Sequence, residues 1–142
     1  MNRPKVVPDS ELDYDSDLIF THEGEIFTGV GFEETPEMGR QEISYRDGMQ
    51  EGWTREWYPS KVLWGEAHYV QGVSHGPTRE FDPAGNLIKE TSYEHGIRLL
   101  TREYNSSGQV VAIEELDPND GAARYLERLR IERNWGPPPG VE

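Results

Sequence analysis

Thr54-Arg55-Glu56-Trp57 returns as Thr78-Arg79-Glu80-Phe81 and again as Thr101-Arg102-Glu103-Tyr104. The three copies are almost evenly spaced, and the second interval is one residue shorter than the first. A nearly fixed period of this kind is typical of repeat proteins, in which each repeat is one small supersecondary unit. The sequence therefore predicts an array of similar units.

Turn signals indicate that each unit is a β-hairpin. Asp47-Gly48 is a strong signal for a two-residue hairpin turn, and Pro59-Ser60-Lys61 and Pro83-Ala84-Gly85 predict turns at the opposite end of the strands. Each repeat then contains two strands and two tight turns. Over residues 12–116 we predict an all-β domain, an elongated single-layer antiparallel β-meander of hairpin repeats.

A second set of residues follows the same period. Tyrosine recurs at the interval of the repeat, with glycine three positions later and, in the first two repeats, another glycine four positions after that. The third repeat is one residue shorter and has Leu100 in place of the second glycine, as terminal repeats often differ from internal ones. The predicted structural repeat residues are Tyr45, Gly48, Gly52, Tyr69, Gly72, Gly76, Tyr93, Gly96, Arg55, Arg79 and Arg102.

Side chains alternate between the two faces of a sheet along each strand. Trp53, Arg55 and Trp57 should therefore share one face, and the threonine and glutamate of the repeated phrase should lie on the other. If the hairpins stack in register, aromatic residues and arginines form neighbouring files, in which guanidinium groups lie over rings. The aromatic file is Trp57, Phe81 and Tyr104, and the glutamate file of the opposite face is Glu56, Glu80 and Glu103.

The segment before the array is predicted to be less regular. Residues 1–11, with two prolines, are expected to be a flexible lead-in. Residues 18–20 and 25–32 are expected to be strands, and residues 33–39 a loop. The strand at 18–20 would then present an open edge.

The segment after the array changes character. Residues 117–120 offer helix-capping side chains, and residues 122–134 are predicted to be an amphipathic helix that ends before Gly136 and a run of prolines. We interpret residues 117–135 as a capping helix for the last hairpin, with a partner-binding helix as the alternative. Residues 136–142 form a tail rich in proline and glycine.

Composition limits the classes of function. The 142 residues include no cysteine, which excludes disulfides, thiolate zinc sites and thiol nucleophiles. No apolar run reaches the length of a membrane span, so we expect a cytoplasmic protein. The net charge of −13 opposes binding to nucleic acid or anionic membranes and favours a basic protein partner. The alternative is that acidity serves only solubility.

Candidate catalytic and metal sites are weak. The four histidines show no metal-ligand spacing and no nucleophilic arrangement. Asp13, Asp15 and Asp17 match the start of a calcium loop, but Leu18 and Gly24 occupy the positions that require glycine and glutamate. We therefore expect no enzyme, no catalytic residue, no metal and no cofactor.

The pattern Tyr45…Gly48…Gly52, repeated from Tyr69, resembles the MORN repeat in its bacterial variant form. Residues 27–30 and 52–59 look like the YwqK-type family, which is described as antitoxins. The resemblance covers about residues 18–116 and departs at Ser60-Lys61 and at Leu100. It implies an elongated antiparallel β-meander without catalytic residues and an antitoxin or immunity role in bacteria.

The sequence thus predicts a non-catalytic protein-binding module that neutralises a basic toxin or effector, as a monomer or an edge-paired homodimer. A structural scaffold or membrane-peripheral MORN module is the alternative, and liposome flotation would separate the two. A hydrolase is a third hypothesis, which the loss of a detected activity on substitution of Glu80 and His75 would support. Two sets of residues are expected to contact the partner, an exposed acidic segment and one aromatic-rich face of the sheet. The acidic segment is Asp13, Asp15 and Asp17, and the aromatic-rich face is Trp53, Trp57, Trp64 and Phe81.

Overall fold

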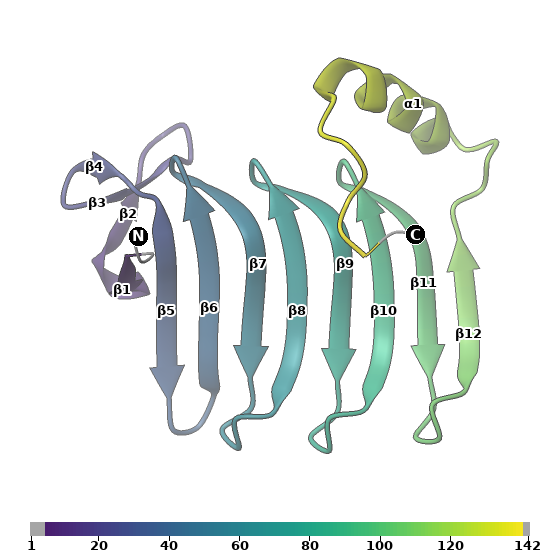
Figure 1. Cartoon of the computed structure of the whole chain (residues 1–142), viewed down its shortest axis with the longest axis horizontal. Coiled ribbons are helices and arrows are strands. Elements are labelled where there is room, and N and C mark those ends of the chain that lie inside the picture. The colour runs from purple at the N-terminus through teal and green to yellow at the C-terminus, as the bar shows by residue number, and fades with distance from the viewer. Residues whose placement is uncertain (1–4, 141–142) are drawn as a thin grey trace.

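A computed structural model describes residues 5–140 of the chain, which form an open, mostly antiparallel sheet followed by one helix (Figure 1). Nine strands pair in the order β1-β5-β6-β7-β8-β9-β10-β11-β12, and β2-β3-β4 form a second, small sheet. The predicted antiparallel β-meander of hairpins with a C-terminal helix is confirmed. The elements are β1 Val6–Pro8, the 3-10 turn η1 Asp9–Glu11, β2 Leu12–Tyr14, β3 Phe20–His22, β4 Glu25–Ile26, β5 Gly29–Thr35, β6 Gly39–Arg46, β7 Met49–Trp57, β8 Leu63–Val70, β9 Val73–Phe81, β10 Leu87–Glu94, β11 Ile97–Tyr104, β12 Val110–Glu115 and α1 Gly121–Arg133.

The hairpin turns at one end of the strands are two-residue turns with positive φ at both positions. Asp47-Gly48 has φ of 51° and 81°, Gln71-Gly72 has 49° and 80°, and His95-Gly96 has 51° and 81°. This is the geometry of a type I′ turn, whose twist matches that of the flanking strands. The prediction from Asp47-Gly48 is confirmed, and the repeat extends it to the other two turns.

The turns at the opposite end retain their geometry where the repeat departs from glycine. Gly85 and Gly108 have φ of 90° and 79°, and Lys61 takes φ of 73° at the corresponding place between β7 and β8. A residue with a Cβ atom is strained in this region.

Lys61→Gly is therefore expected to raise the free energy of unfolding by about 0.5–1 kcal/mol, the relief of strain less the added flexibility of the unfolded chain. Chemical denaturation measures the change. Ser60→Gly is the control, since the φ of Ser60 is not positive. A stabilisation by Ser60→Gly equal to that by Lys61→Gly would contradict this explanation.

β-Bulges follow the repeat as well. Between the pairs Ile43–Thr54 and Tyr45–Gln50, strand β7 has two more residues than β6. Strand β9 has the same excess over β8, whereas β11 exceeds β10 by one residue at Leu99. The residue missing from the third repeat is therefore a bulge residue. In each repeat the periodic tyrosine faces a glycine of the preceding strand, in the pairs Gly29–Tyr45, Gly52–Tyr69 and Gly76–Tyr93.

The N-terminal segment differs from its prediction. Residues 1–4 lie outside the described part of the chain, and Val6–Pro8, expected to be flexible, form β1, parallel to β5. The strand expected at 18–20 begins instead at Phe20 and is the central strand of the small sheet, so it has no open edge. The strand expected at 25–32 is interrupted at Phe27 and Thr28, and the loop expected at 33–39 is confined to residues 36–38.

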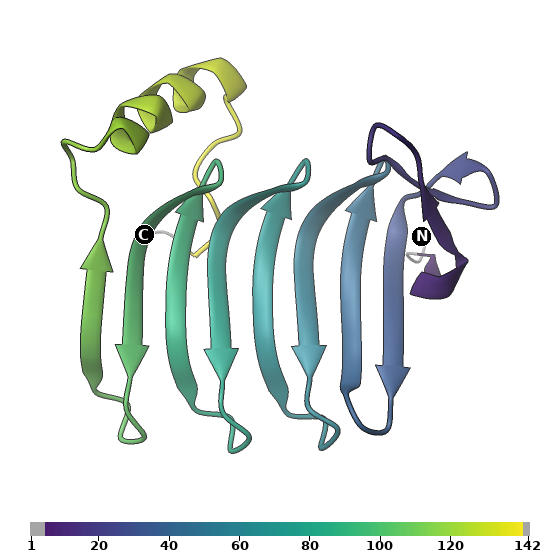
Figure 2. The ribbon, with the colours of Figure 1, turned by 180° about the vertical axis from the view of Figure 1, so that it is seen from behind.

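These differences follow from how the segment packs. Phe27 leaves the strand path to enter a cluster with Val7 and Tyr45, against which Leu12, Phe20 and Ile43 also pack. The cluster fixes the small sheet beside β5 and β6, on the side of the large sheet that Figure 2 shows. The burial of aromatic side chains at this end of the sheet therefore overrides the simple alternating pattern.

The helix α1 agrees with its predicted position to within one residue. Asp120 caps it by accepting a hydrogen bond from the Ala122 N–H at 2.8 Å, and Asn134 ends it in the left-handed conformation. It buries Leu126 and Leu129 and is tied by Arg130 to Glu94 of β10, with a Nε–O distance of 2.7 Å. It lies beyond the ends of the strands and leaves the outer edge of β12 uncovered (Figure 1). No helix within residues 5–140 is long and apolar enough to cross a membrane.

Candidate functional site

One face of the sheet carries a row in which glutamate and arginine alternate across six strands. The register places Arg55 between Glu42 and Glu66, and Arg79 between Glu66 and Glu90. We call this side the ladder face. Its row is Glu42, Arg55, Glu66, Arg79, Glu90 and Arg102. The predicted arginine file is confirmed, but the glutamates between the arginines were missed, although they recur with the period of the repeat.

Arginines neutralise the carboxylates of the ladder face. Glu66 accepts hydrogen bonds from Arg55 Nε and Arg79 Nη1, both at 3.1 Å, and Glu90 accepts one from Arg79 Nε at 2.6 Å. Burial opposes the charge of Arg79, yet its hydrogen bonds to the two carboxylates raise its pKa above the ordinary value. At one end of the row Arg40 pairs with Glu42 at 2.6 Å.

Arg79→Met should lower the free energy of unfolding by about 2–3 kcal/mol, because it leaves Glu66, only 11% exposed, with less compensation and Glu90 without any. Arg98→Met is the matched control, since the Arg98–Glu114 pair is largely exposed and should contribute less than about 0.5 kcal/mol. Urea denaturation of both variants measures the difference. Equal losses of unfolding free energy in the two variants would show that the ion pairs of Arg79 on the ladder face stabilise the protein no more than an exposed pair does.

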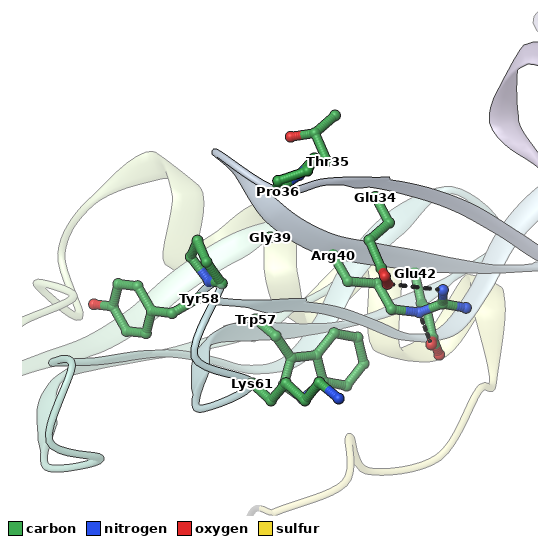
Figure 3. A pocket seen from close by; sticks show the side chains of 10 residues that line it. Glu34, Thr35, Pro36, Gly39, Arg40, Glu42, Trp57, Tyr58 and Lys61 are labelled. Atoms are coloured by element: carbon green, nitrogen blue, oxygen red, sulfur yellow. Dashed lines mark hydrogen bonds and ion pairs between the residues drawn. The ribbon is translucent and has the colours of Figure 1, made fainter.

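A hollow on the ladder face lies beside Trp57, between the β5–β6 and β7–β8 turns (Figure 3). Its volume is about 590 Å³, within the range of small-ligand pockets. Trp57 and Tyr58 supply aromatic surface. Arg40 crosses the hollow and binds Glu34 at 3.2 Å in addition to Glu42, so these charges are already paired. The hollow thus offers aromatic surface beside the side chain of Lys61.

The opposite face carries carboxylates that are not neutralised. Its row runs Glu33, Gln41, Glu56, Gly65, Glu80, Lys89, Glu103 and Ala112. Among the described residues, none of its four glutamates has a basic group within the 4.0 Å of an ion pair, and Glu56 receives only a hydrogen bond from the Gln41 amide at 2.9 Å. Lys89 is the one base in the row. We call this side the carboxylate face.

Trp64 lies on the carboxylate face, between two further hollows. One, of about 200 Å³, is lined by Trp64 with Glu33 and Glu56, and the other, of about 220 Å³, by Trp64 with Glu56 and Glu80. The prediction that Trp64 shares a face with Trp53 and Trp57 is wrong. A bulge opposite Glu56 and Trp57 places Trp64 outside the regular alternation.

The edge of the carboxylate face near β5 is electrostatically strained. Asp9 Oδ1 is buried without a hydrogen-bond partner among the described residues. Burial, and to a lesser extent the charge of Glu33, raise the pKa of Asp9. Burial, helped by the charge of Asp9, raises the pKa of Tyr45 to about 12. Burial and like charge thus both disfavour the ionised forms of Asp9 and Tyr45 at this edge.

The predicted contact residues do not form one site. Asp13, Asp15 and Asp17 are exposed on and after β2, and they line neither the Trp57 hollow nor the two Trp64 hollows. Asp15 Oδ1 accepts the backbone N–H of Asp17 and of Ile19, so its first role is to shape a turn. Strand alternation places Phe81 on the ladder face with Arg79. In residues 5–140, no group of three or more potential ligands is placed to hold a metal ion.

The C-terminal tail covers part of the ladder face. Trp135 stacks on His95 with ring centroids 4.7 Å apart and meets the edge of His75 at 5.2 Å. Farther along, Gly140 lies beside Pro77 and the Arg79 guanidinium. Figure 1 shows the tail in front of β9 and β10. The part of the ladder face over β9 is thus occupied by the chain itself, whereas the Trp64 hollows are open.

His75 holds the tail as a neutral imidazole. Its Nδ1 accepts the backbone N–H of His95 at 3.0 Å and its Nε2 donates to the Gly136 carbonyl at 3.2 Å, which a protonated ring cannot do. Burial lowers the pKa of His75 and that of His95. The charge of Arg133 acts in the same direction, and that of Glu94 in the opposite one.

Because both pKa values are lowered from 6.5, docking of the tail should be fully stable above that pH. It should weaken as the pH falls below 6.5 towards the folded-state pKa values. Trypsin cleavage after Arg133 is then expected to accelerate between pH 7 and pH 5.5, relative to cleavage of an unstructured peptide. His75→Gln should flatten this pH dependence, and an unchanged profile in that variant would contradict the role of His75.

Comparison with protein-family models, with curated proteins and with solved structures found no match for this chain. The support for a function is thus the geometry of its two faces, one neutralised internally and partly covered, the other acidic and open around Trp64.

Proposed function

We propose that this chain is a non-catalytic protein-binding module of the antitoxin or immunity type, which acts in the bacterial cytoplasm and neutralises a basic protein partner by covering its active surface. The observation that carries the proposal is the carboxylate face. Its row holds four glutamates and one lysine, which faces Glu80 and Glu103, and none of the four glutamates has an ion-pair partner among the described residues. The resemblance of the repeats to MORN-variant antitoxins supports the same class.

The contrast between the two faces gives the proposal its physical basis. Where carboxylates serve only the fold, as on the ladder face, arginines of neighbouring strands neutralise them. The glutamates of the carboxylate face stand on alternate strands, separated by Gln41, Gly65 and Lys89, and a basic surface would supply the positive charge that most of the row lacks. Complementary charge would also accelerate association and exclude acidic competitors.

Trp64 is suited to be the anchor of such an interface. Tryptophan is enriched among residues that dominate binding energy, and a lysine or arginine of the partner placed over its ring would gain a cation–π contact. The hollow on each side of Trp64 gives such side chains room beside Glu56. We therefore expect Trp64 and Glu56 to lie near the centre of the interface.

The test is capture of partners from the native cell by the immobilised protein, with identification by mass spectrometry and co-expression with the captured protein. The variant Glu33→Gln/Glu56→Gln/Glu80→Gln should weaken capture of a stoichiometric partner at least about tenfold. It should also abolish rescue of growth from any toxicity that the partner causes.

The matched control is Glu23→Gln/Glu25→Gln/Glu127→Gln, which removes the same charge from exposed positions outside the row. It should keep capture and rescue close to those of the parent protein. Equal effects of the two triple variants would show that binding depends on the net charge of the protein and not on the glutamates of the carboxylate face. The absence of any stoichiometric partner, together with no rescue, would overturn the proposal.

A further inference from the structure

Strand β12 is an open edge of the nine-stranded sheet. It pairs with β11 on one side, and no strand within residues 5–140 pairs with it on the other. All six of its residues are exposed, and three are large and apolar, Val110, Val111 and Ile113, with exposed fractions of 44%, 60% and 57%. Unpaired backbone N–H and C=O groups beside apolar side chains make a template for another strand.

The other end of the sheet is protected in the ways that usually prevent such pairing. The short strand β1 covers β5 over Val30, Gly31 and Phe32. Beyond that cover β5 continues with Glu33 and Glu34, whose charges oppose the addition of a strand. Among the residues of β12, the corresponding charges, Glu114 and Glu115, stand only at its end. The two edges are therefore unequal, and β12 is the one open to pairing.

The interruption of the ladder row points to the same edge. Strands β6, β8 and β10 each contribute a glutamate to the row, but the residue of β12 that faces Arg102 is Ile113. Among the described residues Arg102 has no carboxylate within the 4.0 Å of an ion pair. At this edge an exposed apolar side chain thus replaces the repeating carboxylate.

The order of residues in β12 makes it complementary to itself. In an antiparallel pair, two residues that face each other either both direct their backbone N–H and C=O groups towards the neighbouring strand or both direct them away from it. A strand that pairs with its own copy meets this condition only if the two-fold axis passes through a residue and not between two residues. An axis at Ala112 places Val111 opposite Ile113 of the second copy, and this contact occurs twice. Glu114 then faces Val110, and no two carboxylates stand opposite each other. Arg98 of β11 already forms an ion pair with Glu114, in which Nη2 and Oε1 are 2.8 Å apart.

We propose that β12 pairs with β12 of a second copy of this chain, about an axis at Ala112, and so forms a continuous sheet of eighteen strands from the two nine-stranded sheets. The helix α1 does not hinder this pairing, because it lies beyond the strand ends (Figure 2). The carboxylate faces of both copies remain free, so the pairing is independent of the function proposed above.

The first test is sedimentation equilibrium over a range of protein concentrations. A monomer–dimer equilibrium is expected, and it should shift towards dimer as salt rises, because each copy carries a net charge of −13. Ile113→Lys should weaken the dimer at least about tenfold, since two lysines would enter the pair and two apolar contacts would be lost. Because Ile113 is exposed, the monomer should keep its far-ultraviolet circular dichroism and unfolding midpoint.

The control substitution is Ile131→Lys on the exposed side of α1, which adds the same charge elsewhere and should leave dimerisation unchanged. A second test uses the absence of cysteine from the chain. Ala112→Cys supplies one thiol at the axis and should be joined rapidly to its copy by a short bis-maleimide, whereas Ile131→Cys should not. A protein that stays monomeric at every concentration, or a dimer that Ile113→Lys leaves intact, would overturn the inference.

Discussion

Phe27→Ala is expected to lower the free energy of unfolding by about 4 kcal/mol. The Phe27 side chain is only 2% exposed and lies between the small sheet and the large one. Its ring contacts that of Tyr45 edge to face at 5.7 Å, and its backbone bonds to Phe20 and Gly48. Removing the ring leaves a cavity where three segments meet, so the small sheet should also loosen from β5 and β6.

Equilibrium unfolding in urea measures the loss, and hydrogen exchange of β3 amides shows whether the small sheet opens locally. Ile26→Ala is the matched control, because Ile26 is the preceding residue and is 65% exposed. It should change the free energy of unfolding by less than about 0.5 kcal/mol. Similar losses in the two variants would show that Phe27 does not hold the sheets together.

Gly39→Ala is expected to lower the free energy of unfolding by about 3 kcal/mol. Gly39 begins β6 with φ of 85°, a region in which L-residues are strained, and a Cβ atom there would overlap the backbone carbonyl of Trp57. A backbone group cannot rotate away as a side-chain tip can, so β7 would have to shift. The Trp57 hollow, whose wall includes Gly39, would change shape.

Gly72→Ala separates the two causes of this effect. Gly72 has φ of 80°, close to that of Gly39, but a Cβ atom there would meet nothing within 4 Å. It should therefore cost only the backbone strain, about 1–2 kcal/mol. Thermal and urea denaturation compare the pair. A loss for Gly72→Ala as large as that for Gly39→Ala would remove the overlap with Trp57 from the explanation.

The repeat made most of the sheet predictable from the sequence. The turn glycine Gly48 and the four-residue motif that begins at Thr54 recur at the period of the hairpins. Once one hairpin is located in the sequence, the strands of the others can be located at the same spacing. The helix was predictable because Asp120 caps it and Gly136 follows it. The missing residue near Leu100 also had a local explanation, a bulge one residue shorter.

The candidate site was less predictable, because it depends on bulges and on packing between distant segments. Strand alternation alone places Trp64 with Trp57, but a bulge moves it to the carboxylate face. The glutamates that neutralise the arginines, such as Glu66, do recur with the period of the repeat, so a sequence signal for the ladder existed. No short-range pattern shows that Phe27 leaves its strand or that Trp135 packs on His95.

We propose that the carboxylate face, and not the ladder face, meets the partner. Carbodiimide labelling of carboxyl groups with a small amine, read by mass spectrometry, tests it residue by residue. In the free protein Glu33, Glu80 and Glu103 should react faster than Glu66 and Glu90, which are held by arginines. Bound to its captured partner, the protein should show protection of the first group and little change in the second. Protection of the ladder-face carboxylates, with Glu33, Glu80 and Glu103 still reactive, would contradict the account.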